Sequence, residues 1–223
     1  MSKGALYYGP MHRGLYLRFL KRPLDVVLVV VGGLVFWWVF VVVALLVRLN
    51  LGKPVVFKQP RPGKDAAIFT LYKFRTMTDA RAESGELLPD SERLTSFGRF
   101  LRSSSLDELP EFLNILRGEM SLVGPRPLAV KYLPFYSQQE RRRHLVQPGL
   151  TGLAQVNGRN VAHWETRFAL DVQYVERITF VQDMAILAKT VVKTLHRTDI
   201  GERGTGSVID FDVYRTMDGT SDK

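Results

Sequence analysis

The sequence predicts a mostly helical α+β protein, in which an N-terminal membrane-inserted helix precedes a compact cytoplasmic domain. Three observations predict this class: one long uncharged segment, two short runs of β-forming residues, and several later segments with helical periodicity. At 223 residues the chain can hold one modest domain beside a membrane element. We expect an interfacial segment at 1–20, the membrane helix at 21–50, the domain at 51–195 and a tail at 196–223.

The membrane helix is predicted from residues 26–47, which carry no charged side chain. At about 1.5 Å per residue, this run is long enough to cross a hydrocarbon core of about 30 Å. A cleaved signal peptide is not expected, because the run is too long and lacks a small-residue exit site. A buried helix of a soluble protein is the alternative, although hydrophobicity around the whole circumference favours a membrane.

Basic residues flank this segment on both sides: Arg13, Arg18, Lys21 and Arg22 before it, and Arg48, Lys53, Lys58, Arg61 and Lys64 after it. Clusters of Lys and Arg favour the cytoplasmic face, so a re-entrant helix would place both clusters well. The Gly32-Gly33 pair can loosen the helix and allow a bend. A helix that simply spans the bilayer stays open as an alternative.

A short hairpin is expected next. Residues 54–57 and 67–74 are rich in β-formers, and the prolines and glycine of QPRPG at 59–63 predict the turn that joins them. Residues 78–93 are charged and lack a steady period, which indicates a helix or a mobile loop. A helical turn is expected from Ser96.

Helices are predicted for the rest of the domain at 107–116, 133–144, 164–177 and 181–195. Pro110 is tolerated because it falls in the first turn of its helix. We place residues 138–143 on the solvated side of the second helix. The apolar stripe of the last helix is more typical of a packed core face than of membrane contact.

Composition limits the chemistry. Lys and Arg outnumber Asp and Glu by 31 to 22, which suits an anionic membrane, a phosphorylated substrate or nucleic acid. There is no cysteine and only four histidines, so a metal would be bound mainly by oxygen, which favours Mg²⁺ or Mn²⁺ over zinc.

Asp107 and Glu108 are adjacent carboxylates at the expected start of a helix. Helix capping is the simpler interpretation, since Ser105 and Glu108 fit a Ser-x-x-Glu capping box. The functional interpretation is that one carboxylate attacks a phosphorus atom while its neighbour manages a proton or a metal. The two interpretations are compatible.

Five cations lie beside turn-like or β-like sequence and are candidates for phosphate binding: Lys73, Arg75, Arg102, Arg126 and Arg159. Guanidinium groups fork onto phosphate oxygens and stabilise charge on a transferring phosphoryl group. Taken singly, each is more often an ordinary surface charge. Arg126 is distinguished because Pro125 and Pro127 stiffen the backbone on both sides of it.

Six motifs in order resemble the monotopic phosphoglycosyl transferases, the bacterial sugar transferases that act on polyprenyl phosphate. The resemblance runs from KRPLD at 21–25 to about residue 195, and its marks are QPRPG at 59–63, YKFRTM at 72–77, SLDELP at 105–110, MSLVGPRP at 120–127, PGLTG at 148–152 and QVNGRN at 155–160. The chain resembles the minimal catalytic form. Trp37-Trp38 stands where members commonly carry a Ser-Pro pair that kinks the helix.

This resemblance implies that Asp107 attacks the β-phosphate of a UDP-sugar, releases UMP and forms a phosphosugar-aspartyl intermediate. Polyprenyl (undecaprenyl) phosphate then takes the phosphosugar, with Glu108 assisting deprotonation and Mg²⁺ held at Asp107. Lys73, Arg102, Arg126 and Arg159 correspond to the phosphate-contacting cations. The implied location is the cytoplasmic face of a bacterial inner membrane, in a pathway of exopolysaccharide or lipopolysaccharide synthesis. The sugar and the oligomeric state, including a homo-oligomer, stay open.

Two rivals make different predictions. A non-catalytic anchored module would bind anionic lipid or nucleic acid through scattered Lys and Arg and would be indifferent to Asp107. A metal-dependent phosphatase or nuclease would use water as acceptor, and the absence of three or four spaced carboxylates argues against it. We therefore expect membrane, UDP-sugar and polyprenyl phosphate as partners, and no nucleic acid.

Overall fold

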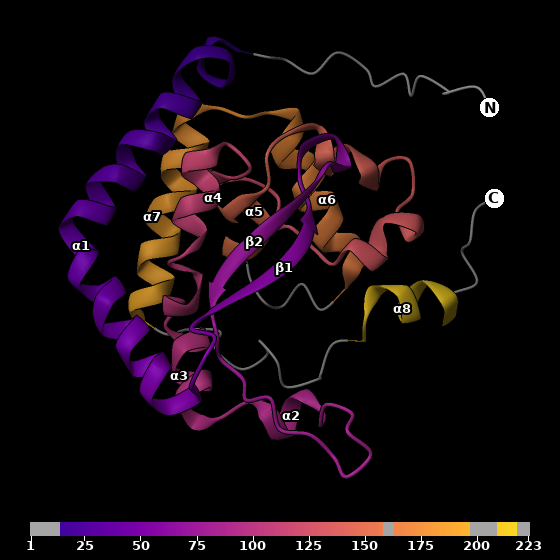
Figure 1. The fold of residues 1–223 in the computed structure, drawn as a ribbon. Helices are drawn as coiled ribbons and strands as arrows, with labels where there is room; N and C mark the ends of the chain where they lie inside the picture. The colour runs from indigo at the N-terminus through magenta and orange to yellow at the C-terminus, as the bar shows by residue number, and fades with distance from the viewer. Residues whose placement is uncertain (1–13, 158–162, 197–208, 218–223) are drawn as a thin grey trace.

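The structure, a computed structural model, describes residues 14–157, 163–196 and 209–217. It shows small sheets and short helices gathered beside one long helix, α1 (Figure 1). The prediction of a mostly helical α+β fold with a long apolar N-terminal helix is confirmed.

Helix α1 spans Lys21–Leu51 and follows directly on a π-helical turn, Tyr16–Leu20. Within the described residues, this continuous helix is the one segment long and apolar enough to cross a membrane. Non-helical backbone angles at Phe36 (φ −107°, ψ 16°) kink it next to Trp37-Trp38, a short way beyond the glycine pair.

Both halves of α1 pack on the domain, and Figure 1 shows the helix lying along one side of it. In the first half, Val29 is buried and Arg22 donates to the carbonyl oxygens of Ile115 and Leu116. In the second half, Val43 and Val47 are buried in a cluster with Phe74 and Leu101. Between them, Phe40 packs edge-on against Phe112, with ring centroids 5.6 Å apart. The helix is therefore part of the core and not a free tether.

The predicted hairpin is present, but its turn lies elsewhere. Strand β1 (Val56–Pro62) pairs antiparallel with β2 (Ile68–Phe74), and the 3₁₀ turn Lys64–Ala66 joins them. The prediction of a turn at 59–63 is wrong, because Pro60 and Pro62 lie within β1. A two-stranded hairpin has open outer edges, where residues without an N–H group are tolerated.

Short helices follow the hairpin: α2 is Asp90–Arg93, α3 is Ser96–Ser103, and α4 is Glu111–Arg117. A single helix over 107–116 is a wrong prediction. Residues Leu106–Glu108 form a separate 3₁₀ turn, and α4 begins only after Pro110. Proline lacks an N–H and suits the entry to a helix, so it separates the two elements.

The predicted helix at 133–144 is also wrong. Two 3₁₀ segments, Val130–Phe135 and Glu140–Leu145, stand there, and Pro134 lies inside the first. The expected solvated side is correct for Gln138, Gln139 and Arg141, which are exposed. It is wrong for Arg143, which is buried in an ion pair with Asp171 (2.8 Å). A buried guanidinium needs such a partner, and the partner comes from another helix far along the chain.

Strand β3 (Ser121–Val123) pairs in parallel with β4 (Gly149–Thr151). Helices α5 (Leu153–Val156), α6 (Trp164–Glu176) and α7 (Phe180–His196) follow, so the two long predicted helices are confirmed. The apolar stripe predicted on α7 is only partly a core face: Leu187 packs on the core, while Phe180 and Val191 are exposed. Ile186, which lies outside that stripe, is buried.

The expected tail contains helix α8 (Phe211–Met217). Phe211 is fully buried among Tyr132, Tyr136, Trp164 and Phe168. The prediction of a flexible tail over 196–223 is therefore wrong for this helix. The polar, glycine-rich composition of the segment gave no sign that one aromatic side chain, Phe211, packs into the core of the domain.

Candidate active site

One lysine on the hairpin gathers three acidic side chains. Lys73 Nζ lies 3.0 Å from Glu108 Oε1, 3.0 Å from Glu111 Oε1 and 3.9 Å from Asp107 Oδ2. Arg126 Nη2 contacts the same Glu108 oxygen at 2.7 Å. We call these five residues the Lys73 cluster. It brings together residues from β2, the 3₁₀ turn, α4 and the loop after β3.

The acidic pair is held by an unusual backbone. Ser105 has φ 57°, a left-handed conformation that is uncommon for a residue with a side chain, and the 3₁₀ turn starts after it. Both carboxylates are buried. The capping-box prediction is wrong, since no side chain caps this turn and the Glu108 carboxylate binds Lys73 and Arg126.

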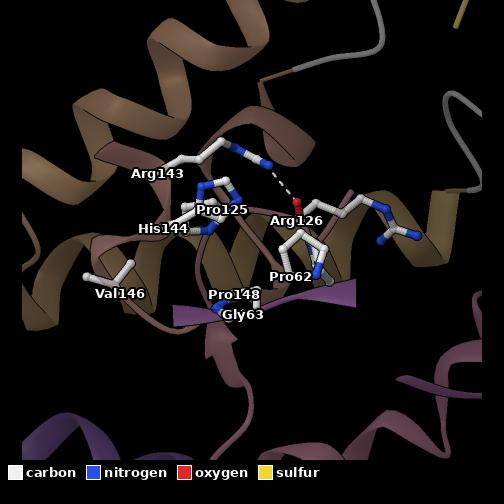
Figure 2. A pocket seen from close by; sticks show the side chains of 9 residues that line it. Pro62, Gly63, Pro125, Arg126, Arg143, His144, Val146 and Pro148 are labelled. Atoms are coloured by element: carbon white, nitrogen blue, oxygen red, sulfur yellow. Dashed lines mark hydrogen bonds between the residues drawn. The ribbon is translucent and has the colours of Figure 1, made fainter. Parts of the chain in front are cut away.

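Arg126 is positioned by close backbone packing. A Cβ on Gly149 would lie 2.0 Å from the Gly124 nitrogen, so only glycine lets these two segments approach. Gly149 N then donates to Pro125 O at 3.0 Å, and Arg143 Nη2 donates to Arg126 O at 2.7 Å. Figure 2 shows the Arg126 side chain extending away from Arg143 and His144. The loop backbone is thus fixed while the Arg126 side chain stays partly exposed.

Glu111 and Asn114 belong to the site and were missed by sequence reasoning. Asn114 is fully buried; it accepts from Tyr72 N (3.1 Å) and donates to Thr70 O (2.7 Å). These bonds fasten α4 to β2 on either side of Leu71 and so bring Glu111 to Lys73. The sequence carried no clear signal for Glu111, because Asp107 lies in the 3₁₀ turn and Glu111 in α4, so the two do not share a face of one helix.

Burial sets the electrostatics of the cluster. It raises the pKa of the Glu111 carboxyl to about 7, against the opposing effect of the Lys73 charge. Glu108 raises the pKa of Arg126, whose guanidinium therefore stays charged. Three carboxyl groups thus share two cations. A proton on Glu111 relieves part of that imbalance.

The other predicted cations have different surroundings. All three Arg75 nitrogens bind within the protein, to Met77 O, Lys53 O and Asp79 Oδ2. Arg75 therefore braces the chain around the end of β2, and this geometry does not favour the predicted substrate contact. Arg102 Nε donates to Thr76 Oγ1 at 3.0 Å. Arg159 lies outside the described residues.

The described residues suit a metal ion that is bound partly by the protein and partly by the substrate, better than one enclosed by protein ligands alone. No group of three His, Cys, Asp or Glu side chains among them could enclose an ion. Mg²⁺ usually takes one or two carboxylates and fills its shell with water and substrate phosphate oxygens. Asp107 provides a hard oxygen ligand of that kind, so the donor set fits.

Comparisons with known proteins identify the family of this chain. A family model described as "Bacterial sugar transferase" matches residues 16–197. The chain is 55% identical over 168 residues to an uncharacterized sugar transferase, EpsL, of Bacillus subtilis, covering 72% of this chain and 83% of the relative. It is 37% identical over 202 residues to the UDP-glucose:undecaprenyl-phosphate glucose-1-phosphate transferase of Caulobacter vibrioides, covering 84% and 73%.

Some relatives are much longer. The chain is 37% identical over 202 residues to the undecaprenyl-phosphate galactose phosphotransferase of Salmonella typhimurium, covering 81% of this chain but 41% of the relative. The similarity therefore covers less than half of that protein's length. The match to the family model, residues 16–197, contains every residue of the Lys73 cluster.

Proposed function

Because the chain belongs to the bacterial sugar transferase family, we propose that it transfers a sugar-1-phosphate from a UDP-sugar to polyprenyl phosphate and releases UMP. The observation that carries the proposal is the Lys73 cluster: a buried acidic pair with two cations that can meet a phosphate. The names of the relatives support undecaprenyl phosphate as the acceptor.

In the first half-reaction, an Asp107 carboxylate oxygen forms a bond to the β-phosphorus of the donor. The bond from that phosphorus to the bridging oxygen breaks, and UMP leaves with the oxygen and the electron pair. Lys73 and Arg126 are positioned to stabilise negative charge on the transferring group. Because their side chains are already held by Glu108, little reorganisation is needed when the donor arrives.

In the second half-reaction, an oxygen of polyprenyl phosphate attacks the same phosphorus and Asp107 departs as a carboxylate. Glu108 accepts the proton of the acceptor phosphate. The products are a polyprenyl diphosphate sugar and the regenerated enzyme. A bound Mg²⁺ would be held by Asp107 together with substrate oxygens, and it would reduce the repulsion between the carboxylate and an anionic phosphate.

We propose that both ends of α1 lie on the cytoplasmic face of the inner membrane. The support is that both halves of the helix pack on the same domain and that a kink at Phe36 divides them. A straight crossing would separate the last turns of α1 from residues that they contact here. Reactivity of a cysteine placed at residue 15 with a reagent applied from outside intact cells would contradict this topology.

The decisive experiment measures UMP release by the full chain in detergent or nanodiscs with UDP-sugars, Mg²⁺ and polyprenyl phosphate. We expect UMP release for at least one sugar, and a covalent phosphosugar on the peptide containing Asp107. Asp107→Asn should abolish both without changing the melting temperature, because the substitution keeps the shape of the side chain. Release that continues in Asp107→Asn would refute the mechanism. Without the lipid acceptor the mechanism allows at most one UMP per enzyme molecule, so repeated turnover without that acceptor would favour a hydrolase.

A further inference from the structure

Two arginines near the Lys73 cluster have no role in the chemistry above. Arg61 lies near the end of β1, and Arg167 lies in the first half of α6. Both are partly buried. The segment that follows Arg61 lies against the Arg126 loop, because Pro62 and Gly63 line one small pocket together with Pro125, Arg126 and Pro127 (Figure 2).

Arg61 is incompletely satisfied. Its Nη2 donates to Gln59 Oε1 at 2.7 Å, but its Nε is buried without a hydrogen-bond partner in the part of the chain that the structure describes. Within that same part, no carboxylate oxygen lies within 4.0 Å of its guanidinium. A buried N–H group without an acceptor is costly and calls for an explanation.

Arg167 is also without an ion pair among the described residues. Its guanidinium lies over the Trp164 ring, 4.5 Å from the centroid. Asp171, one turn further along α6, is taken by Arg143 through two hydrogen bonds of 2.8 and 3.0 Å. The aromatic ring fixes the Arg167 guanidinium but does not neutralise its charge.

Among the arginines around Arg126, some have a carboxylate partner and some do not. Glu108 pairs with Arg126 and Asp171 pairs with Arg143, whereas Arg61 and Arg167 keep no such partner among the described residues. Burial lowers the pKa of Arg61 and of Arg167, and the nearby charge of Arg126 lowers both further. Like charges held close together in a partly buried site are destabilising unless an anion joins them.

We propose that Arg61 and Arg167, together with Arg126, bind a phosphate group of a substrate. The proposal rests on the proposed function for the identity of that substrate. A dianionic phosphate would neutralise Arg61 and Arg167 and would supply the acceptor that Arg61 Nε lacks. The phosphate belongs either to the nucleotide that leaves or to the lipid that arrives, and these two sources share the same chemistry.

The test compares the binding of UMP and of uridine to the full chain by calorimetry in detergent, and measures KM for polyprenyl phosphate. The variants are Arg61→Gln, Arg167→Gln and the milder Arg61→Lys. Arg177→Gln is the matched control, because Arg177 is exposed at the end of α6 and its side chain makes no hydrogen bond or ion pair within the described residues. Melting temperatures report whether each variant is folded.

We expect Arg61→Gln to weaken UMP binding at least tenfold while uridine binding stays within twofold, with partial recovery in Arg61→Lys. This result would assign the site to the nucleotide. A KM for polyprenyl phosphate raised at least tenfold, with unchanged UMP binding, would assign it to the acceptor. The inference is overturned if folded Arg61→Gln and Arg167→Gln both match the control in both measurements.

The inference is also overturned by a second pair of results. In that case the wild-type protein binds UMP no more tightly than uridine, and both variants keep the wild-type KM for polyprenyl phosphate. A different result would contradict the proposed function alone. The wild-type protein would then bind UMP more tightly than uridine but would release no UMP from any UDP-sugar. The two failures are therefore distinguishable.

Discussion

Two lysine-centred clusters in this protein differ in how their charges are matched. Lys21 Nζ lies 2.6 Å from Asp183 Oδ2, and the hydroxyl groups of Tyr16 and Tyr174 complete the carboxylate at 2.7 and 2.8 Å. We call these four residues the Lys21 cluster. It joins α1 to α7 with one positive charge, one negative charge and bonds to both Asp183 oxygens.

The Lys73 cluster is more open. Three carboxyl groups share two cations, and the Arg126 side chain keeps 31% of its surface exposed, against 9% for Lys21 and 2% for Asp183. A matched, closed cluster is complete without a ligand and serves the fold. An open one has a cationic side chain, Arg126, that a phosphate can reach. The difference between them separates structural from functional charge in the same molecule.

The largest expected effect is on the Lys73 cluster. Lys73→Met should slow UMP release by a factor of about 10²–10³, the usual result of removing one preorganised donor from a charged transition state. The melting temperature should change little, because the remaining carboxyl groups can take up protons. Steady-state UMP release is the measurement, with Lys58→Met on the neighbouring strand as control. A loss below threefold would mean that Lys73 serves the fold.

The Lys21 cluster should show the opposite pattern. Asp183→Asn removes the carboxylate that pairs directly with buried Lys21, which should reduce the free energy of unfolding by about 3 kcal/mol. Denaturant unfolding in micelles measures this, and folded protein should keep its rate of UMP release. Glu176→Gln, at an exposed pair with Arg142, should cost less than about 1 kcal/mol. If Asp183→Asn and Glu176→Gln reduced the free energy of unfolding equally, the Lys21 cluster would not be a special source of stability.

The smallest effect concerns pH. The pKa of Glu111 is raised to about 7 from 4.5, so between these values the folded protein binds more protons at this site than the unfolded chain. Its contribution to stability is therefore present at low pH and is lost as pH rises toward 7, by about 1 kcal/mol or more. Glu111→Gln should lose less melting temperature between pH 5 and pH 8 than the parent. A parallel decline would show that another group titrates.

The sequence predicts what local patterns determine. The membrane helix, α3, α6, α7 and the existence of the hairpin follow from hydrophobic runs and periodicity. The position of the hairpin turn and the two 3₁₀ segments do not, because they depend on which strand edge is open and on the burial of Arg143 against Asp171. Helix α8 depends on one side chain, Phe211, meeting an aromatic cluster from distant segments.

For the candidate site too, local sequence patterns predicted some residues, and contacts between distant segments decided the others. Motif spacing indicated Asp107, Glu108, Lys73 and Arg126, and the structure places them together. Arg75 lies in an equally good motif, but its three bonds to other groups arise only from the folded chain. Glu111 and Asn114 look like ordinary helix residues in the sequence, so neither their burial nor their contacts with the hairpin could be inferred.

The packing of α1 has a practical consequence for anyone who wants a water-soluble form. Cutting the chain after residue 52 would uncover Phe74, Leu101 and Phe112, and it would leave Asp183 and the Ser121 hydroxyl without their partners Lys21 and Asp25. We expect such a fragment to aggregate instead of folding. Solubilisation therefore requires detergent or lipid around the whole chain, because the inner face of α1 is also part of the hydrophobic core of the domain.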